Sequence, residues 1–107
     1  MAIAEVSILP VGTGTTSLSS WVAGLQRLLS AAPEKIRFEM TGMSTLIEGS
    51  PADLFVVLAR LHEAPFVAGA GRVYTVIKID DRRDKESTLE SKVDSVRGKI
   101  SQNPDLN

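Results

Sequence analysis

The sequence has no cysteine and a single histidine, His62, among its 107 residues. A chain without cysteine forms no disulfide and carries no thiolate nucleophile. One histidine does not supply the several nitrogen or sulfur ligands that zinc and copper usually require. The composition therefore argues against a disulfide framework, thiol chemistry and a transition metal held by protein ligands, and we expect no cofactor.

The chain also lacks a strong charge of one sign and a long apolar run. It carries 12 basic and 13 acidic residues, which gives a formal net charge of -1. Binding to phosphate backbones needs an excess of positive charge, so this balance argues against nucleic acid as a partner. No apolar run approaches the roughly 20 residues that span a bilayer, and the first residues lack the features of a signal peptide. We therefore expect a cytosolic protein with no membrane partner.

The apolar residues that are present recur with the periods of strands and helices. Strands are predicted at 2–9, 35–40, 44–48 and 72–79, and helices between 17 and 33, between 50 and 65, and after 87. Ser17 is the predicted N-cap of the first helix, and Pro10 and Pro65 are predicted to end a strand and a helix. Ser87 and Glu90 are predicted to form a capping box for the last helix.

The order of these elements is βαββαβ with an extra helix at the end. Two βαβ units joined by a hairpin give an antiparallel four-stranded sheet with both main helices on one face, which is the α+β ferredoxin-like fold. We expect this single domain over residues 1–100, with residues 101–107 as a fraying tail. Apolar residues on both strand faces and along the last helix predict a homo-oligomer, either a dimer or a tetramer.

Several short motifs, taken in order, resemble the small thiamine-binding protein family related to YkoF. The match spans nearly all of residues 3–100, and its best-marked pieces are Thr45-Leu46-Ile47-Glu48-Gly49 and the run Asp80-Asp81-Arg82-Arg83-Asp84. The resemblance implies ferredoxin-like subunits that form dimers and tetramers and bind thiamine (vitamin B1) or its hydroxymethylpyrimidine part without known catalysis. Gly42 stands where the family pattern leads us to expect proline, which implies a looser hairpin.

An aminopyrimidine presents ring nitrogens as acceptors and an exocyclic amine as donor. A site for it needs carboxylate and hydroxyl groups within an apolar pocket. Thr45 and Glu48 fit this need, and Ser17 is a third candidate polar contact. Met43 and Trp21 are candidate apolar walls of the same pocket.

Each of these residues also has a structural interpretation. Glu48 can cap the helix that begins after Ser50, and Trp21 and Met43 can be core residues. Two other functions stay open at this point. One is a small oligomeric enzyme that uses Glu48 or His62 as its acid or base, and the other is a purely structural or regulatory interaction module.

Overall fold

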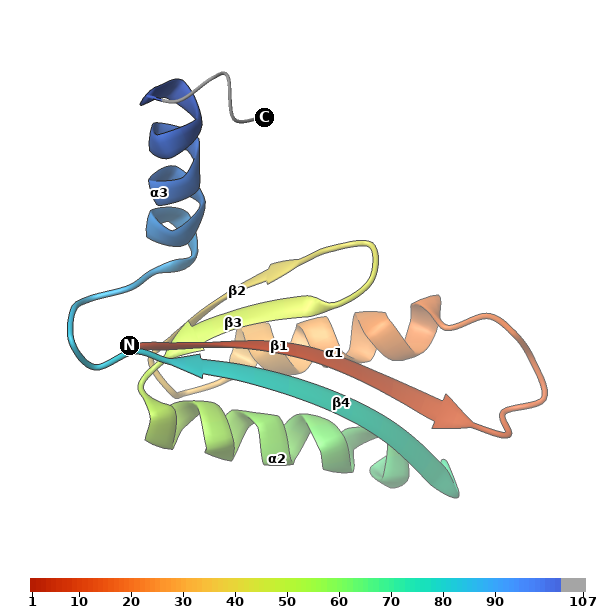
Figure 1. Cartoon of the computed structure of the whole chain (residues 1–107). Coiled ribbons are helices and arrows are strands. Elements are labelled where there is room, and N and C mark those ends of the chain that lie inside the picture. Colours follow the sequence, from red (N-terminus) through yellow and green to blue (C-terminus); the bar gives the residue numbers. More distant parts are fainter. Residues whose placement is uncertain (103–107) are drawn as a thin grey trace.

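The computed structural model of the protein describes residues 1–102, and Figure 1 shows their arrangement. Helices and strands follow one another in the predicted order. Their bounds are β1 Ala2–Val11, α1 Ser19–Ala31, β2 Ile36–Met40, β3 Thr45–Gly49, α2 Pro51–Val67, β4 Arg72–Asp81 and α3 Leu89–Gln102. None of the helices in the described range is long and apolar enough to cross a bilayer.

The strands form one four-stranded antiparallel sheet in the order β2-β3-β1-β4. Figure 1 shows α1 and α2 on the same side of this sheet, where α2 packs on β1, β3 and β4. The arrangement confirms the predicted ferredoxin-like fold with an added C-terminal helix. We call the side that α1 and α2 cover the helix face, and the other side the open face.

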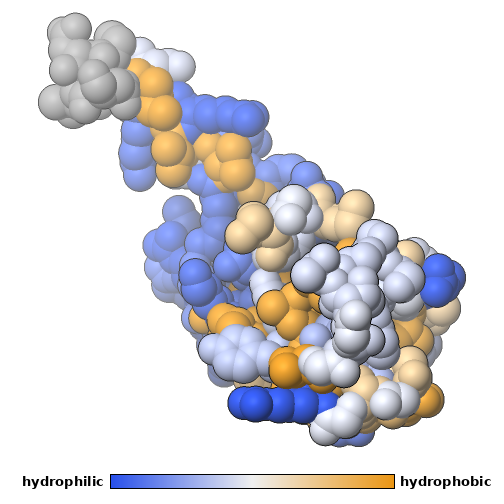
Figure 2. Space-filling view, turned by 90° about the vertical axis from the view of Figure 1, so that its right-hand side faces the viewer, coloured by the Kyte–Doolittle hydropathy of each residue, from blue (hydrophilic) through white to orange (hydrophobic). Residues whose placement is uncertain are grey.

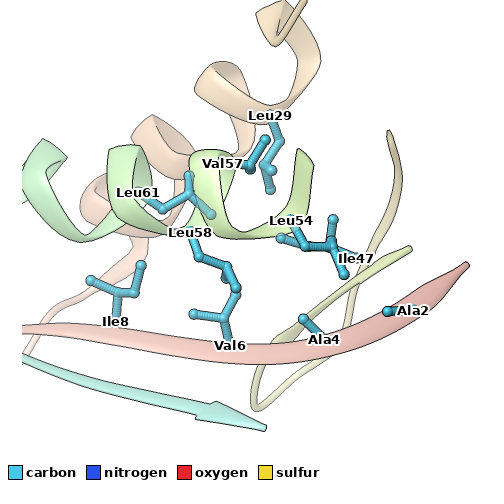
Figure 3. Packing of buried hydrophobic residues seen from close by; sticks show 10 residues of the cluster. All are labelled: Ala2, Ala4, Val6, Ile8, Leu29, Ile47, Leu54, Val57, Leu58 and Leu61. Carbon is cyan, nitrogen blue, oxygen red and sulfur yellow. The ribbon is translucent and has the colours of Figure 1, made fainter. Parts of the chain in front are cut away.

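The core lies between β1 and the two covering helices. Every second residue of β1 from Ala2 to Ile8 is buried and turned toward the helices, as Figure 3 shows. Ile47 of β3 and Leu29 of α1 join the same cluster. The α2 residues of the cluster are Leu54, Val57, Leu58 and Leu61. Burying one such side chain contributes about 1.5–3 kcal/mol, so this cluster dominates the stability of the fold.

The prediction that Pro10 ends the first strand is wrong, because β1 continues to Val11. Only residues 2–6 of β1 pair with β3, so the rest of the strand has a ladder partner on β4 alone. Proline is tolerated where its missing N–H faces no neighbouring strand. Ile8 and Leu9 lie beyond the end of the β3 ladder, where they line a pocket described below.

Two predicted helix boundaries are also wrong. The N-cap position of α1 is Leu18, whose side chain makes no capping bond, so Ser17 is not the N-cap. The second helix does not stop at Pro65 but continues two residues further. Proline costs a helix one backbone hydrogen bond. Here that loss falls in the last turn, shortly before Gly69 at φ +105° leads the chain out of the helix.

The last helix stands apart from the body of the domain. None of the residues of α3 is buried, and Figures 1 and 2 show it projecting outward with apolar side chains exposed along it. Helix α3 includes Ser101 and Gln102, which the predicted tail had covered. The remainder of that predicted tail, residues 103–107, lies outside the described residues.

A different pair of residues from the predicted one caps α3. Thr88 Oγ1 accepts a hydrogen bond from Ser91 N–H at 3.0 Å, and Ser91 Oγ accepts one from Thr88 N–H at 2.8 Å. The predicted box of Ser87 and Glu90 is therefore wrong by one position. The carboxylate of Glu90 turns instead to Arg37 on β2.

Candidate functional site

A pocket of about 460 Å³ opens between α1 and the end of the β2–β3 hairpin. Its walls come from the helix face of β1 and from the apolar side of α1, and residues 41–44 of the turn form its rim. The walls include Val6, Ile8, Val22, Leu25, Leu29 and Leu61. Small-molecule sites usually measure roughly 300–1,000 Å³ and combine apolar walls with a few polar groups. The pocket has the size and lining that a small heterocycle requires.

A buried hydroxyl from β3 reaches this pocket. Thr45 is 8% exposed, and its Oγ1 accepts a hydrogen bond from Gln26 Nε2 at 2.9 Å. Because this oxygen already accepts, its proton stays free to be donated to a ligand. Ser7 also borders the pocket, but strand alternation turns its side chain to the open face, where Ser7 Oγ donates to the carbonyl of Met43 at 3.1 Å. The lining on the helix face therefore offers the hydroxyl of Thr45 as a donor.

The turn at the rim is closed by a threonine. Thr41 N–H donates to the Ser44 carbonyl at 2.8 Å, and Thr41 Oγ1 accepts from the Ser44 N–H at 3.0 Å. Ser44 Oγ in turn donates to Glu5 Oε2 at 3.1 Å. Gly42 does not adopt a positive φ, so its backbone does not require glycine. Hydrogen bonds from Thr41 thus hold the rim without the proline of the family pattern.

Of the five predicted ligand residues, Thr45 and Met43 line this pocket, and Met43 lies at its mouth with 89% of its surface exposed. Ser17 immediately precedes the lining residue Leu18 but does not line the pocket itself. Trp21 lines a separate groove of about 350 Å³ between α1 and α2, and it is absent from the buried core cluster. The structure therefore brings together two of the predicted residues, with a third beside them.

Glu48, the fifth, lies on the open face of the sheet. It is opposite Ile3 in the β1–β3 ladder, and strand alternation turns both away from the core face. The residue is 1% exposed, and its Oε1 and Oε2 accept hydrogen bonds from Arg37 Nη1 and Leu89 N–H, each at 2.8 Å. The capping interpretation named the wrong helix, because Ser50 Oγ caps α2 while Glu48 meets the start of α3.

Arg37 joins Glu48 to a second carboxylate, that of Glu90. Its Nη1 donates to Glu90 Oε2 at 3.0 Å, and Nη2 donates to Glu90 Oε1. This hydrogen bonding is the main reason that the pKa of Glu90 falls to about 2. The bond to Glu90, followed by the charge of Glu48, raises the pKa of Arg37. Glu48 is the buried member of this cluster, and it also accepts a hydrogen bond from the first backbone amide of α3, that of Leu89.

Sequence reasoning missed Gln26 and Ser7. Gln26 lies four residues after Val22 and three before Leu29, on the side of α1 that lines the pocket. Gln26 is a polar residue among apolar residues on this side of α1, and this pattern could have identified it from the sequence as a candidate contact. No comparable signal marked Ser7, because its place beside the pocket depends on the position of the Met43 carbonyl.

The titratable residues do not assemble into a catalytic group at the pocket. His62 Nδ1 lies 2.7 Å from Thr75 Oγ1, between α2 and β4, whereas Glu48 lies on the open face. Among residues 1–102, no group of three or more histidine and acidic side chains is arranged to hold a metal ion. The two residues considered for acid–base chemistry are therefore separated by the sheet.

The sequence is similar to proteins from bacteria and archaea. It is 55% identical over 98 residues to UPF0045 protein YqgV from Bacillus subtilis, covering 90% of this chain and 94% of that protein. It is 46% identical over 101 residues to a UPF0045 protein from Methanothermobacter thermautotrophicus, covering 94% of this chain and 100% of that protein. Both matches run through nearly the whole domain.

Solved structures share the fold. A hypothetical protein from Methanocaldococcus jannaschii superimposes with a TM-score of 0.78 at 29% identity, covering 89% of this chain and 94% of that chain. A Thermotoga maritima protein, provisionally named for thiamine biosynthesis or salvage, has a TM-score of 0.68 at 20% identity, covering 89% of this chain and 97% of that chain. The family model described as thiamine-binding protein matches residues 4–97. The chain therefore belongs to the thiamine-binding protein family.

Proposed function

We propose that the protein binds thiamine or a related aminopyrimidine, such as hydroxymethylpyrimidine, in the pocket beside α1 and releases it unchanged. It would act as a carrier, buffer or sensor of this ligand. The observation that carries the proposal is the buried hydroxyl of Thr45, which reaches a pocket with apolar walls. Membership of the thiamine-binding family supports the choice of ligand class.

The hydrogen-bonding state of the Thr45 hydroxyl matches a ring nitrogen of an aminopyrimidine. Thr45 Oγ1 accepts from Gln26, so its proton is free for a ring nitrogen. The thiazolium end of thiamine would then point to the mouth, where the thioether of Met43 can cover it. Ser17, beside the mouth, is a candidate contact for that end.

The lining supports binding without catalysis. General acid–base chemistry needs a titratable side chain within hydrogen-bond reach of the ligand. The described residues that line this pocket are apolar residues, glycine, serine and threonine. In this proposal Trp21 and Glu48 make no contact with the ligand, because Trp21 lines another groove and both oxygens of Glu48 are bonded within the chain.

Calorimetric titration with thiamine and with hydroxymethylpyrimidine tests the proposal. We expect dissociation constants in the micromolar range or below. Thr45→Val keeps the shape of the side chain and removes the hydroxyl, which should weaken binding by about 1–3 kcal/mol because the ring nitrogen loses its donor. Thr75→Val is the matched control, since it removes a hydroxyl that contacts His62 and not the pocket.

The outcomes separate the alternatives. Binding that weakens in Thr45→Val but not in Thr75→Val supports the pocket. Absence of heat with either compound up to about millimolar concentration, where binding is worth only ~4 kcal/mol, would sink the proposal. Chemical turnover of a bound compound would contradict the non-catalytic role, and mass spectrometry of the recovered ligand detects it.

We also propose that the protein acts as a homo-oligomer, a dimer or a dimer of dimers. The support is the apolar stripe on α3, where Val93, Val96 and Ile100 are 47%, 58% and 46% exposed. Exposed apolar stripes of this kind are commonly buried by another copy. Val96→Lys should weaken association in sedimentation experiments, and an unchanged oligomer would remove α3 from the proposed contact.

A further inference from the structure

The hydroxyl of Thr45 is a buried group whose own proton has no acceptor among residues 1–102. Thr45 is 8% exposed, and its Oγ1 takes part in one hydrogen bond within these residues, from Gln26 Nε2 at 2.9 Å. A threonine hydroxyl has one proton and two lone pairs, and here an amide N–H occupies one lone pair. A buried donor without an acceptor is destabilising. The Thr45 proton is therefore available to an acceptor that a ligand brings into the pocket.

The other hydroxyls that line the pocket already donate within the chain. Ser7 and Thr41 donate to carbonyls of the turn at 3.1 and 3.0 Å. Ser44 donates to a carboxylate oxygen of Glu5 at 3.1 Å. No charged side chain among the described lining residues competes for the proton of Thr45. Thr45 is therefore the lining hydroxyl from which a buried ligand can receive a hydrogen bond.

Gln26 is positioned by the packing of α1. It lies on the same side of the helix as Val22, four residues earlier, and Leu29, three residues later. Val22 lines the pocket, and Leu29 is a buried core residue, as Figure 3 shows. Gln26 itself is half-buried and does not line the pocket. Its effect on a ligand therefore passes through Thr45.

Gln26 sets the kind of hydrogen bond that Thr45 offers to a ligand. Because the amide N–H of Gln26 occupies a lone pair of Oγ1, the Thr45 proton turns away from Gln26. A ligand N–H can use the second lone pair only if this proton takes a direction in which the described chain holds no acceptor. The pair therefore favours a ligand that accepts a hydrogen bond at this point and disfavours one that donates.

A 4-aminopyrimidine and its 4-oxo counterpart differ in this respect. The ring nitrogen beside the amine of the 4-amino compound carries no proton, so it accepts a hydrogen bond. In the 4-oxo compound the ring adopts the lactam form, and the same nitrogen carries a proton and donates. The two compounds have nearly the same shape, so apolar walls cannot distinguish them strongly, whereas a fixed hydrogen-bond donor can.

We propose that Gln26 and Thr45 together select 4-aminopyrimidines over their 4-oxo counterparts, with Thr45 donating to the ring nitrogen beside the exocyclic amine. Thr45 contacts the ligand, and Gln26 is a positioning residue that acts through it. This inference rests on the proposed function and deepens it, because it states which pyrimidines the pocket accepts. Binding of the 4-oxo compound leaves a buried donor without an acceptor. Wild type should therefore bind hydroxymethylpyrimidine roughly 10- to 100-fold more tightly than its 4-oxo analogue.

Reversing the polarity of position 26 tests the proposal. In Gln26→Glu the new carboxylate accepts the Thr45 proton, so both lone pairs of Oγ1 become available to a ligand N–H. Calorimetric titration at a slightly alkaline pH, where both rings are uncharged, should then show tighter binding of the 4-oxo analogue. Gln26→Met keeps a similar size and offers no hydrogen bond, so the hydroxyl is free to rotate. The preference should fall to about threefold or less in that variant.

Two controls separate this effect from added charge and from other structural changes. Gln102→Glu adds the same negative charge at the last residue of α3 and should leave the preference unchanged. In the double variant Gln26→Glu with Thr45→Val the reversal should disappear, because position 26 acts through the hydroxyl. A reversal that persists without the hydroxyl would overturn the proposal. Thermal unfolding monitored by circular dichroism checks that each variant is folded.

NMR of the ligand-free protein gives a readout that does not depend on binding. Gln26 Nε2 donates to Thr45 Oγ1, so the signals of the Gln26 side-chain amide protons should shift in Thr45→Val. Thr75→Val is the matched control, because its hydroxyl contacts His62, and it should leave these signals in place. Gln26 signals that stay at their wild-type positions in Thr45→Val would overturn the proposed pair.

The titrations distinguish a failure of this inference from a failure of the proposed function. Equal affinity of wild type for the two compounds, or tighter binding of the 4-oxo analogue, would refute the selection and leave pyrimidine binding in place. A wild-type preference that Gln26→Glu does not change would remove Gln26 from the proposal and so refute it. Binding of neither compound would refute the proposed function, and this inference with it.

Discussion

Replacing Glu48 by glutamine tests how the last helix is attached to the domain. The wild-type carboxylate is almost fully buried and accepts two hydrogen bonds, from Arg37 and from the first backbone amide of α3, that of Leu89. Glutamine keeps one acceptor oxygen, but its NH2 group then faces one of these two donors. At least one bond to a charged group is therefore lost without a replacement partner.

The expected cost follows from these contacts. A hydrogen bond to a charged group contributes about 1.5–3 kcal/mol, so the attachment of α3 should weaken by about 2–3 kcal/mol. That change corresponds to a rise of about 30- to 150-fold in the equilibrium for opening at the start of α3. The effect should stay local, because none of the residues of α3 is buried in the core.

Amide hydrogen exchange measured by NMR reads this equilibrium directly. Leu89 N–H donates to Glu48, so its exchange should accelerate in Glu48→Gln. Ser91 N–H donates to Thr88 Oγ1 within the same cap and serves as the internal control. Exchange at Leu89 that stays at the wild-type rate in a folded Glu48→Gln protein would refute the attachment. Loss of thiamine binding in this variant would contradict the assignment of the ligand to the opposite face.

Two further predictions concern pH and packing. The pKa of Glu90 is lowered to about 2, so its contribution to stability is present above the ordinary value near 4.5 and is lost as pH falls toward 2. Urea unfolding across this range should show a smaller pH dependence in Glu90→Gln than in wild type, and equal slopes would contradict the ion pair. Gly49→Ala should destabilise the fold by about 1–3 kcal/mol, because the new methyl would lie 3.1 Å from both Ile36 Cγ2 and the Lys35 carbonyl. Gly42→Ala meets no atom within 4 Å and is the matched control, so equal unfolding midpoints for the two variants would refute the packing argument.

The strand and helix pattern of the fold was readable from the sequence because its periodicities are strong. Alternation in the first strand and the three- and four-residue spacing on the first two helices predicted the βαββαβ order that the structure has. The boundaries at Pro10 and Pro65 were less predictable. Pro10 is tolerated because it lies beyond the β3 ladder, and Pro65 because it lies in a last turn, and neither circumstance is visible without the neighbouring elements.

The site was only partly readable. Thr45 and Met43 were predicted from the mixture of hydroxyl and apolar residues around the turn, and both line the pocket. Glu48 was placed with them because its carboxylate suits an aminopyrimidine and it follows Thr45 by three residues in the same short strand. A separation of three residues in a strand, however, turns side chains to opposite faces of the sheet.

The sequence by itself determined the periodic pattern of buried residues, and with it the order of the elements and the core between sheet and helices. Tertiary structure alone decided which polar atoms meet. Glu48 accepts a hydrogen bond from the amide of Leu89, which is 41 positions further along the chain. Ser7 donates a hydrogen bond to the carbonyl of Met43, which is 36 positions away. The periodicity of apolar residues indicates which side of an element is buried. Hydrogen-bond partners depend on where segments that are distant in the sequence lie in space, and no local sequence pattern indicates this.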